Sequence, residues 1–239
     1  MLTVASKLAH GHASVLMPEG HSHSEWHVIR FRTGPMRSAL NAAALARELG
    51  NEPPVILPVG LTFRDPHARF TDLFVEYAEP LRVPELPDAE HGARLLAGEW
   101  VEPDKETTIK VRDEIRDRLG SITPDAPDLD TWRAWLLLGQ LDAQSSGSPC
   151  SNWQEEVLAA RSVRDRMRSS SGRVWQGPEA CGEEDLAATS EVTLLAREAA
   201  ATLHEMNLDG RATNRISSRI LFPKTMLSAA ALTAILFLA

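Results

Sequence analysis

The residues best suited to chemistry lie in one short polar stretch near the start of the chain. The turn sequence Pro18-Glu19-Gly20 ends an apolar run and is followed directly by three small polar or imidazole side chains: His21, Ser22 and His23. Glycine has no Cβ, so the backbone at Gly20 can approach a ligand closely, and the groups around it can donate hydrogen bonds to an anion. The stretch therefore predicts an anion-binding turn.

Strands and helices are expected to alternate around this turn. We expect a strand at 13–17, a helix over Pro35 to Leu49, and strands over Val55 to Phe63 and Phe70 to Tyr77. The helix has Pro35 in its first turn and Gly50 just past its end, which is the usual placement of these two residues. This order predicts an α/β fold whose functional loops lie at strand ends.

The second half of the chain has a helical pattern. Amphipathic helices are expected over Thr107 to Leu119, Asp128 to Leu141, Trp153 to Met167 and Asp185 to Met206. Apolar residues recur at four-residue spacing in the first of these, and Asp128 is a good N-cap for the second. We expect four parts: a sheet-and-helix domain over 1–86, a helical extension over 87–143, a mostly helical region with flexible linkers over 144–224, and an apolar segment over 225–239.

The apolar segment 225–239 contains no charged residue. As a helix it would span roughly 22 Å, which is short of the ~30 Å hydrocarbon core of a membrane. We interpret it as an apolar terminal helix, a transmembrane helix that the chain cuts short, with a buried terminal helix as the alternative. Basic residues precede it, as expected on the cytoplasmic side of a membrane: Arg211, Arg215, Arg219 and Lys224.

The composition excludes some classes of protein. The chain has 239 residues and a net charge of −8, which argues against a nucleic-acid partner. Cys150 and Cys181 form no Cys-x-x-Cys motif, which favours a reduced, intracellular protein without a disulfide framework. Met1 to His12 lacks the basic start and long apolar stretch of a signal peptide.

Three further motifs follow the Pro-Glu-Gly turn in order. Arg32-Thr33-Gly34 is a basic-x-Gly sequence, Val55 to Gly60 is an apolar run that contains Pro58, and Phe70 to Tyr77 leads into Glu79 to Val83. Together the four motifs resemble the glycerolipid (PlsC-like) acyltransferase family. The Pro-Glu-Gly-x-Ser-His form resembles the glycerol-3-phosphate or dihydroxyacetone-phosphate acyltransferase branch. The resemblance covers about residues 9–86.

The resemblance implies a membrane-associated enzyme of phospholipid synthesis that moves a fatty acyl group from a thioester to a glycerol-phosphate-type acceptor. The thioester, of coenzyme A or acyl carrier protein, is a co-substrate, and no other cofactor and no metal is implied. Arg32 or Arg37 would supply a cation for the phosphate, since arginine suits phosphate geometry. The implied substrate-binding residues are Pro18, Glu19, Gly20, His21, Ser22, His23, Arg32, Gly34 and Pro58.

The general base of such an enzyme is a histidine in a His-x-x-x-x-Asp motif that precedes Pro-Glu-Gly. That motif is not found before Pro18, so we assign no catalytic residue. His67 and Asp72 have the right spacing but follow the Val55 to Gly60 run, and in an extended strand their side chains would lie roughly 16 Å apart on opposite faces. We therefore predict little or no acyl transfer by the chain as given. It is either a piece of a membrane enzyme or a non-catalytic relative that binds lipid or a partner.

Two rival patterns carry less weight. Five of the eight histidines lie between His10 and His27, but no cysteine or His-Glu-x-x-His motif accompanies them, so metal binding is disfavoured. The arginines between Arg161 and Arg173 could touch anionic lipid, but acidic residues are interspersed, which favours a solvated helix face. Trp132 and Trp135 are interpreted as core residues of a helix rather than membrane anchors.

Overall fold

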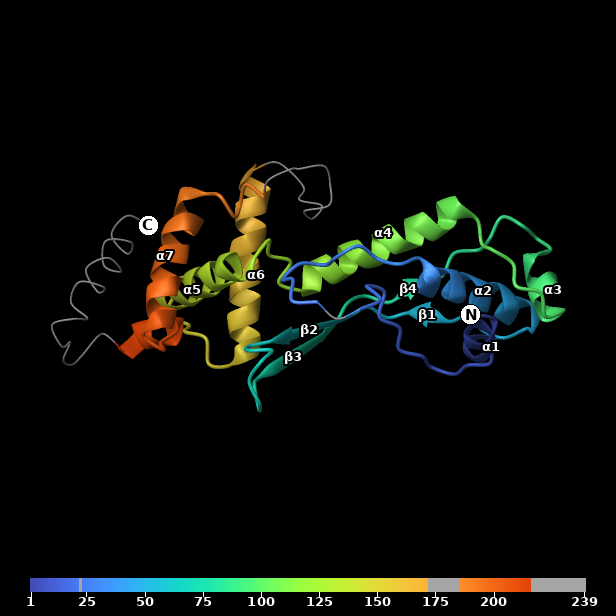
Figure 1. Cartoon of the computed structure of the whole chain (residues 1–239), viewed down its shortest axis with the longest axis horizontal. Coiled ribbons are helices and arrows are strands. Elements are labelled where there is room, and N and C mark those ends of the chain that lie inside the picture. Colours follow the sequence, from blue (N-terminus) through green and yellow to red (C-terminus); the bar gives the residue numbers. More distant parts are fainter. Residues whose placement is uncertain (22, 172–184, 216–239) are drawn as a thin grey trace. The chain divides into compact units, whose positions relative to one another are not determined.

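The computed structural model describes residues 1–21, 23–171 and 185–215. Most regular structure in these residues is helical, and the strands are short (Figure 1). The elements, in chain order, are α1 (Leu2–Ala9), α2 (Gly34–Glu48), β1 (Val55–Ile56), β2 (Val59–Phe63), β3 (Leu73–Tyr77), β4 (Leu81–Arg82), α3 (His91–Leu96), α4 (Lys105–Ile122), α5 (Leu129–Ser145), α6 (Trp153–Ser171), α7 (Glu191–Glu205) and the 3-10 helix η1 (Gly210–Arg215).

The chain divides into two compact units, each with its own core. Unit 1 comprises Met1–Ser24, Val28–Leu61 and Val75–Thr123, and it contains helices α1 to α4 and the β1–β4 pair. Unit 2 comprises Glu25–His27, Thr62–Phe74 and Pro124–Ala239, and it contains helices α5 to α7 and η1. The β2 and β3 strands each begin in one unit and end in the other.

Helix α2 forms the centre of unit 1. Pro35 lies in its first turn, and the alanine-rich stretch from Met36 to Ala46 is buried almost all round. A helix that is buried on every side must be covered by neighbours, and α1, α3 and α4 all contact it. Val111 and Ile115 of α4 pack against Met36 and other residues of this core.

The strands form two separate antiparallel pairs. In the first, Val55 of β1 lies opposite Arg82 of β4. In the second, the Ala78 amide donates to the Pro58 carbonyl and the Arg64 amide to the Asp72 carbonyl, both at 3.0 Å. This antiparallel register places three apolar pairs on one face: Val59 with Tyr77, Leu61 with Val75, and Phe63 with Leu73. All six of these side chains are exposed.

The predicted α/β sheet-and-helix domain is wrong. The expected strand at residues 13–17 is not a strand, and the described strands make two two-stranded antiparallel sheets rather than one sheet with a crossover helix. Pro58 explains part of the difference, because proline donates no hydrogen bond and here separates β1 from β2. Without a strand before α2, that helix cannot connect two parallel strands as the α/β prediction required.

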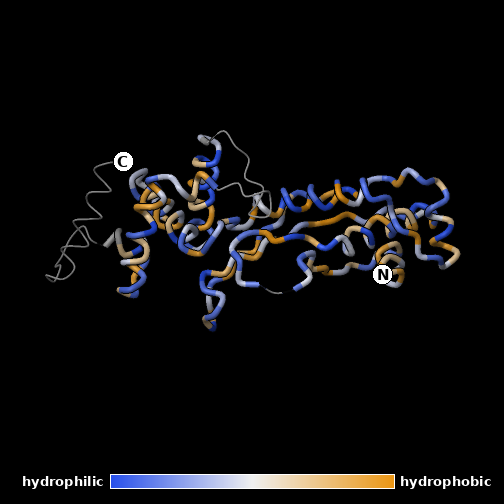
Figure 2. Tube along the Cα trace, turned by 45° about the horizontal axis from the view of Figure 1, so that its top comes forward, coloured by the Kyte–Doolittle hydropathy of each residue, from blue (hydrophilic) through white to orange (hydrophobic). Residues whose placement is uncertain are grey.

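Helix α5 is the centre of unit 2 and contacts α6, α7 and η1. Its N-terminus is capped by Asp128, whose side chain accepts from the Thr131 amide at 2.7 Å. Trp132 and Trp135 are 1% and 0% exposed, which confirms their interpretation as core residues. Apolar and polar residues alternate along the helices in Figure 2, as amphipathic packing requires.

The helix predictions for the second half are largely confirmed. The structure has helices α4, α5 and α6 where helices over 107–119, 128–141 and 153–167 were expected. The prediction was wrong at the start of α7, because residues 186–188 form turns and Ser190 caps the helix by accepting from the Thr193 amide. A local side-chain cap thus overrides the longer apolar pattern.

The predicted apolar terminal helix at 225–239 lies outside the described residues. Among the helices that the structure does describe, none combines the length and the apolar composition that crossing a bilayer needs.

Candidate functional site

The Pro-Glu-Gly sequence forms a tight turn in the loop between α1 and α2. The Gly20 amide donates to the Met17 carbonyl at 3.2 Å, with Pro18 in the second position of the turn. Proline favours that position because its φ angle is already correct. Gly20 has a φ of +78°, which residues with a Cβ rarely adopt. The turn predicted from sequence is therefore present, and its glycine is required for conformation.

Glu19 ties the two arms of this loop together. One carboxylate oxygen accepts from the Ile29 amide at 3.2 Å, and the other lies 3.0 Å from Nε2 of His23. His23 and Glu19 are 18% and 29% exposed, so the pair is only partly open to solvent. The ring of His21 lies edge-on to that of His23, with centroids 6.2 Å apart. A carboxylate that holds a histidine in this way fixes the orientation of its ring.

Arg32 reaches back over the turn. Its amide donates to the Pro18 carbonyl at 2.8 Å. Its side chain crosses Gly20 so closely that a Cβ there would lie 2.6 Å from the Cδ and Nε atoms. The Arg32 residue is exposed, and its guanidinium makes no ion pair with the described residues. Arg37, the other cation considered, pairs instead with Glu102 at 3.3 Å. Arg32 is thus an exposed cation that lies directly against the turn.

The structure gathers only some of the residues that the resemblance implied. Pro18, Glu19, Gly20, His23 and Arg32 form one connected cluster, which His21 adjoins. The remaining three predicted residues lie differently. Ser22 is outside the described residues, Gly34 begins α2 beside Met1, and Pro58 lies between β1 and β2 and accepts from the Ala78 amide.

A second polar cluster lies in unit 2, and sequence reasoning missed it. The Arg64 guanidinium donates to both carboxylate oxygens of Glu156, at 2.9 and 3.0 Å, and to Asp72 at 2.9 Å. Gln140 donates a further bond to Glu156 at 3.0 Å, and the guanidinium stacks 4.5 Å above the Trp153 ring. The Glu156 side chain is 4% exposed. Both oxygens of this buried carboxylate therefore accept charge-assisted hydrogen bonds from Arg64.

The chain has two His-x-x-x-x-Asp sequences, at 67–72 and 204–209. In neither does the described structure show the histidine bonded to the aspartate. Asp72 bonds to Arg64 and not to His67. The extended strand on which we based the separation of this pair is wrong, because residues 67–70 form turns and a bend. His204 and Asp209 have the same spacing, a signal that the sequence analysis overlooked. Nε2 of His204 lies 3.4 Å from the Arg133 guanidinium, and Asp209 accepts from Arg211. Burial would raise the pKa of Asp209, but the hydrogen bond and charge of Arg211 outweigh it and lower that pKa.

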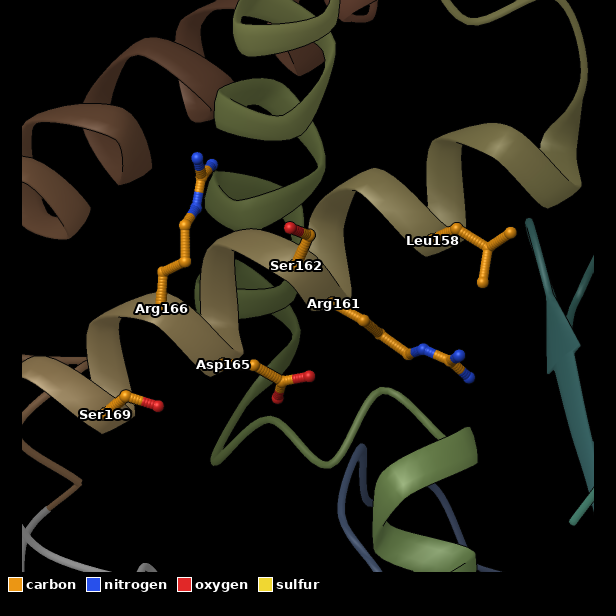
Figure 3. A pocket seen from close by; sticks show the side chains of 6 residues that line it. All are labelled: Leu158, Arg161, Ser162, Asp165, Arg166 and Ser169. Carbon is orange, nitrogen blue, oxygen red and sulfur yellow. The ribbon is translucent and has the colours of Figure 1, made fainter. Parts of the chain in front are cut away.

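The arginines of α6 are engaged in ion pairs within unit 2. Arg168 bonds to Asp125 and Asp185 at 3.1 and 2.8 Å, and Arg164 is buried and donates to the Pro124 carbonyl. A shallow hollow runs along the same helix, lined by Leu158, Arg161, Ser162, Asp165, Arg166 and Ser169 (Figure 3). The Arg161 and Arg166 side chains extend in different directions in that view, so the two cations do not converge on one ligand.

Metal ligation finds no support in the described part of the chain. No group of three or more histidine, cysteine, aspartate or glutamate side chains there is arranged to hold an ion. Among the clustered histidines, His10 bonds to the Ser6 carbonyl at 2.7 Å and His23 pairs with Glu19.

Known proteins do not identify this chain. Comparisons with protein-family models, with curated proteins and with solved structures found no match. The acyltransferase resemblance therefore rests on the motifs themselves.

Proposed function

We propose that the Pro-Glu-Gly loop, meaning Pro18 to His21 together with His23 and Arg32 of unit 1, binds the acceptor of a glycerolipid acyltransferase reaction, a small molecule that carries a phosphate monoester and a hydroxyl. The observation that carries the proposal is the placement of Arg32 against Gly20, beside the Glu19–His23 pair. Two motifs that are separate in sequence thereby make one cluster with an exposed cation. Arginine matches phosphate with two parallel hydrogen bonds.

The reaction defines what the loop has to do. The acceptor hydroxyl attacks the thioester carbonyl, an ester C–O bond forms, the C–S bond breaks, and the hydroxyl proton passes to a general base while the thiolate leaves. In this proposal Arg32 holds the phosphate, Gly20 leaves room for the Arg32 side chain, and Glu19 fixes the ring of His23 beside it. The proposal assigns no general base, so it concerns binding of the acceptor and not the rate of transfer.

A second candidate function is a non-catalytic protein that binds lipid or a protein partner at a membrane. It is favoured by the exposed apolar face of the β2–β3 pair in unit 1, which includes Val59, Leu61, Val75 and Tyr77. Contiguous exposed apolar patches of a few hundred Å² mark interaction surfaces in soluble proteins. Cosedimentation with phosphatidylcholine–phosphatidylserine vesicles tests this candidate. Binding that a Leu61→Lys variant abolishes would support it, and recovery of the unaltered chain in the supernatant would contradict it.

Titration with glycerol 3-phosphate and with dihydroxyacetone phosphate, followed by isothermal calorimetry, tests the proposed function. We expect saturable binding that Arg32→Gln weakens about tenfold or more, because a charge-assisted bidentate contact is lost. Arg112→Gln is the matched control, since Arg112 is a surface arginine of the same unit that pairs with its neighbour Asp113. The absence of saturable binding, or equal affinity in Arg32→Gln, would overturn the proposal.

An acyl-transfer assay tests the remaining prediction. With palmitoyl-coenzyme A and either acceptor, the purified chain is expected to release little or no free thiol. Robust turnover would show that the chain contains a base that we did not assign.

A further inference from the structure

Unit 2 contains a partly open pocket, and no residue of the Pro-Glu-Gly loop lines it. Its volume is about 150 Å³, and its walls come from α5, α6, α7 and the segment that leads into η1. One side is apolar and includes Leu136, Leu137, Leu203 and Leu208. We call this cavity the α5–α7 pocket. Ligand sites of this kind combine apolar walls with a few polar groups that fix the orientation of the ligand.

The two carboxylates that line the pocket already have partners within unit 2. Glu156 and Arg64 line it, and the carboxylate already accepts from Arg64 twice and from Gln140 once. Asp209, another lining carboxylate, accepts from the Arg211 backbone and guanidinium. Both lining carboxylates therefore have cationic partners, and the pocket does not present free negative charge to a cation.

Of the two arginines that line the pocket, Arg133 has the weaker partners. The Arg133 guanidinium and Nε2 of His204 lie 3.4 Å apart, and both residues line the pocket. The carboxylate paired with Arg133 is that of Asp130, at 3.5 Å and largely exposed, so this ion pair is weak. A ligand carboxylate placed here would give the guanidinium a stronger acceptor than His204 or Asp130, because two parallel N–H bonds match its two oxygens.

The geometry points to a binding site for a small organic carboxylate with a short apolar tail. The carboxylate lies against Arg133 and His204, and the tail lies against the leucines of α5 and α7. The cavity is smaller than the ~300–1,000 Å³ of pockets that hold drug-sized ligands, so a ligand of this size has a chain of a few carbons. This inference does not depend on the acceptor site of unit 1, and either can fail without the other.

NMR titration of the full chain with hexanoate tests the site. We expect saturable shifts of the methyl groups of Leu136, Leu137 and Leu203 at millimolar hexanoate. Hexanamide has the same tail without the charge, and acetate has the charge without the tail, so both are expected to bind at least tenfold more weakly. Hexanamide binding as tightly as hexanoate, or no saturable shift with hexanoate, would overturn the inference without any variant.

Two arginine variants locate the carboxylate. Arg133→Gln is expected to weaken hexanoate binding about tenfold, because the guanidinium is lost while a polar, uncharged side chain remains. Arg166→Gln is the control, since Arg166 is an exposed arginine of the same unit that pairs with Asp142. Equal weakening in the two variants would show that hexanoate binding depends on the overall charge of the protein and not on Arg133.

Discussion

The Pro-Glu-Gly loop of unit 1 and the Arg64–Glu156 cluster of unit 2 are both built from ionised side chains, but by different routes. The loop joins residues that lie close together in the chain, from Pro18 to Arg32, and its side chains stay partly exposed. The cluster joins residues 92 positions apart and buries the carboxylate of Glu156. The contacts of the loop are thus local, whereas the cluster ties distant segments of unit 2 together.

The largest expected effect comes from breaking the buried cluster. Arg64→Leu leaves the Glu156 carboxylate buried with Gln140 as its remaining described donor, and removing one partner of a buried pair costs about 3–5 kcal/mol. Urea unfolding of the variant measures the loss. Arg112→Leu, at an exposed pair of unit 1, is expected to cost less than about 1 kcal/mol.

The double variant Arg64→Leu with Glu156→Leu sharpens this test. Removing both charges is expected to recover much of the stability, because the penalty arises from the unpaired carboxylate rather than from the loss of attraction. A double variant as unstable as Arg64→Leu would show that packing of the arginine on Trp153 matters more than its charge.

The next effect concerns pH and belongs to unit 1. Burial of His91 lowers its pKa below the ordinary 6.5, and Nε2 of the ring lies 2.8 Å from the Asn41 side-chain oxygen. The unfolded chain therefore binds a proton more readily than the folded chain. The contribution of His91 to stability is present above pH 6.5 and is lost as the pH falls below it, by at most about 1.4 kcal/mol per pH unit.

Thermal unfolding between pH 7.5 and 5 checks the sign of this effect. A His91→Gln variant, which can still bond to Asn41, is expected to lose less stability than the unaltered chain over that range. An unchanged pH dependence in the variant would rule out His91 as its source.

A smaller effect distinguishes two reasons for a glycine at position 20: its positive φ angle and the close approach of the Arg32 side chain. Gly20→Ala and Gly50→Ala both place a Cβ at a positive φ, +78° and +71°, and each is expected to cost about 1 kcal/mol. The added Cβ meets the Arg32 side chain at Gly20 but has no atom within 4 Å at Gly50. Calorimetry should therefore show weaker binding of glycerol 3-phosphate for Gly20→Ala alone. Equal binding by the two variants would remove Gly20 from the proposed site.

The smallest effect on stability is expected at the exposed face of the β2–β3 pair. Leu61→Lys changes a side chain that is 47% exposed, so the free energy of unfolding should move by no more than about 0.5 kcal/mol. Self-association, measured by light scattering, should decrease because the apolar patch is interrupted. A large loss of stability would mean that this face is covered in the folded protein.

Sequence reasoning was reliable where the deciding contacts are local. Asp128 caps α5 through the amide of Thr131, three residues later, and Pro35 lies in the first turn of α2. It was wrong on the sheet, because the same apolar run that predicts a strand does not say which strand pairs with it. Pro58 was part of the predicted site, but in the structure it separates two strands and accepts from Ala78.

By itself, the sequence determined most of the helices and the Pro-Glu-Gly turn, because helical hydrogen bonds, caps and a glycine at positive φ depend on neighbours a few residues away. Sequence reasoning offered Arg32 as a cation for the turn, but it did not place the Arg32 side chain over Gly20. Only the tertiary structure decided the pairing of Arg64 with Glu156 and the meeting of Arg133 with His204. These contacts depend on how helices pack, and no pattern within either segment specifies the partner in the other.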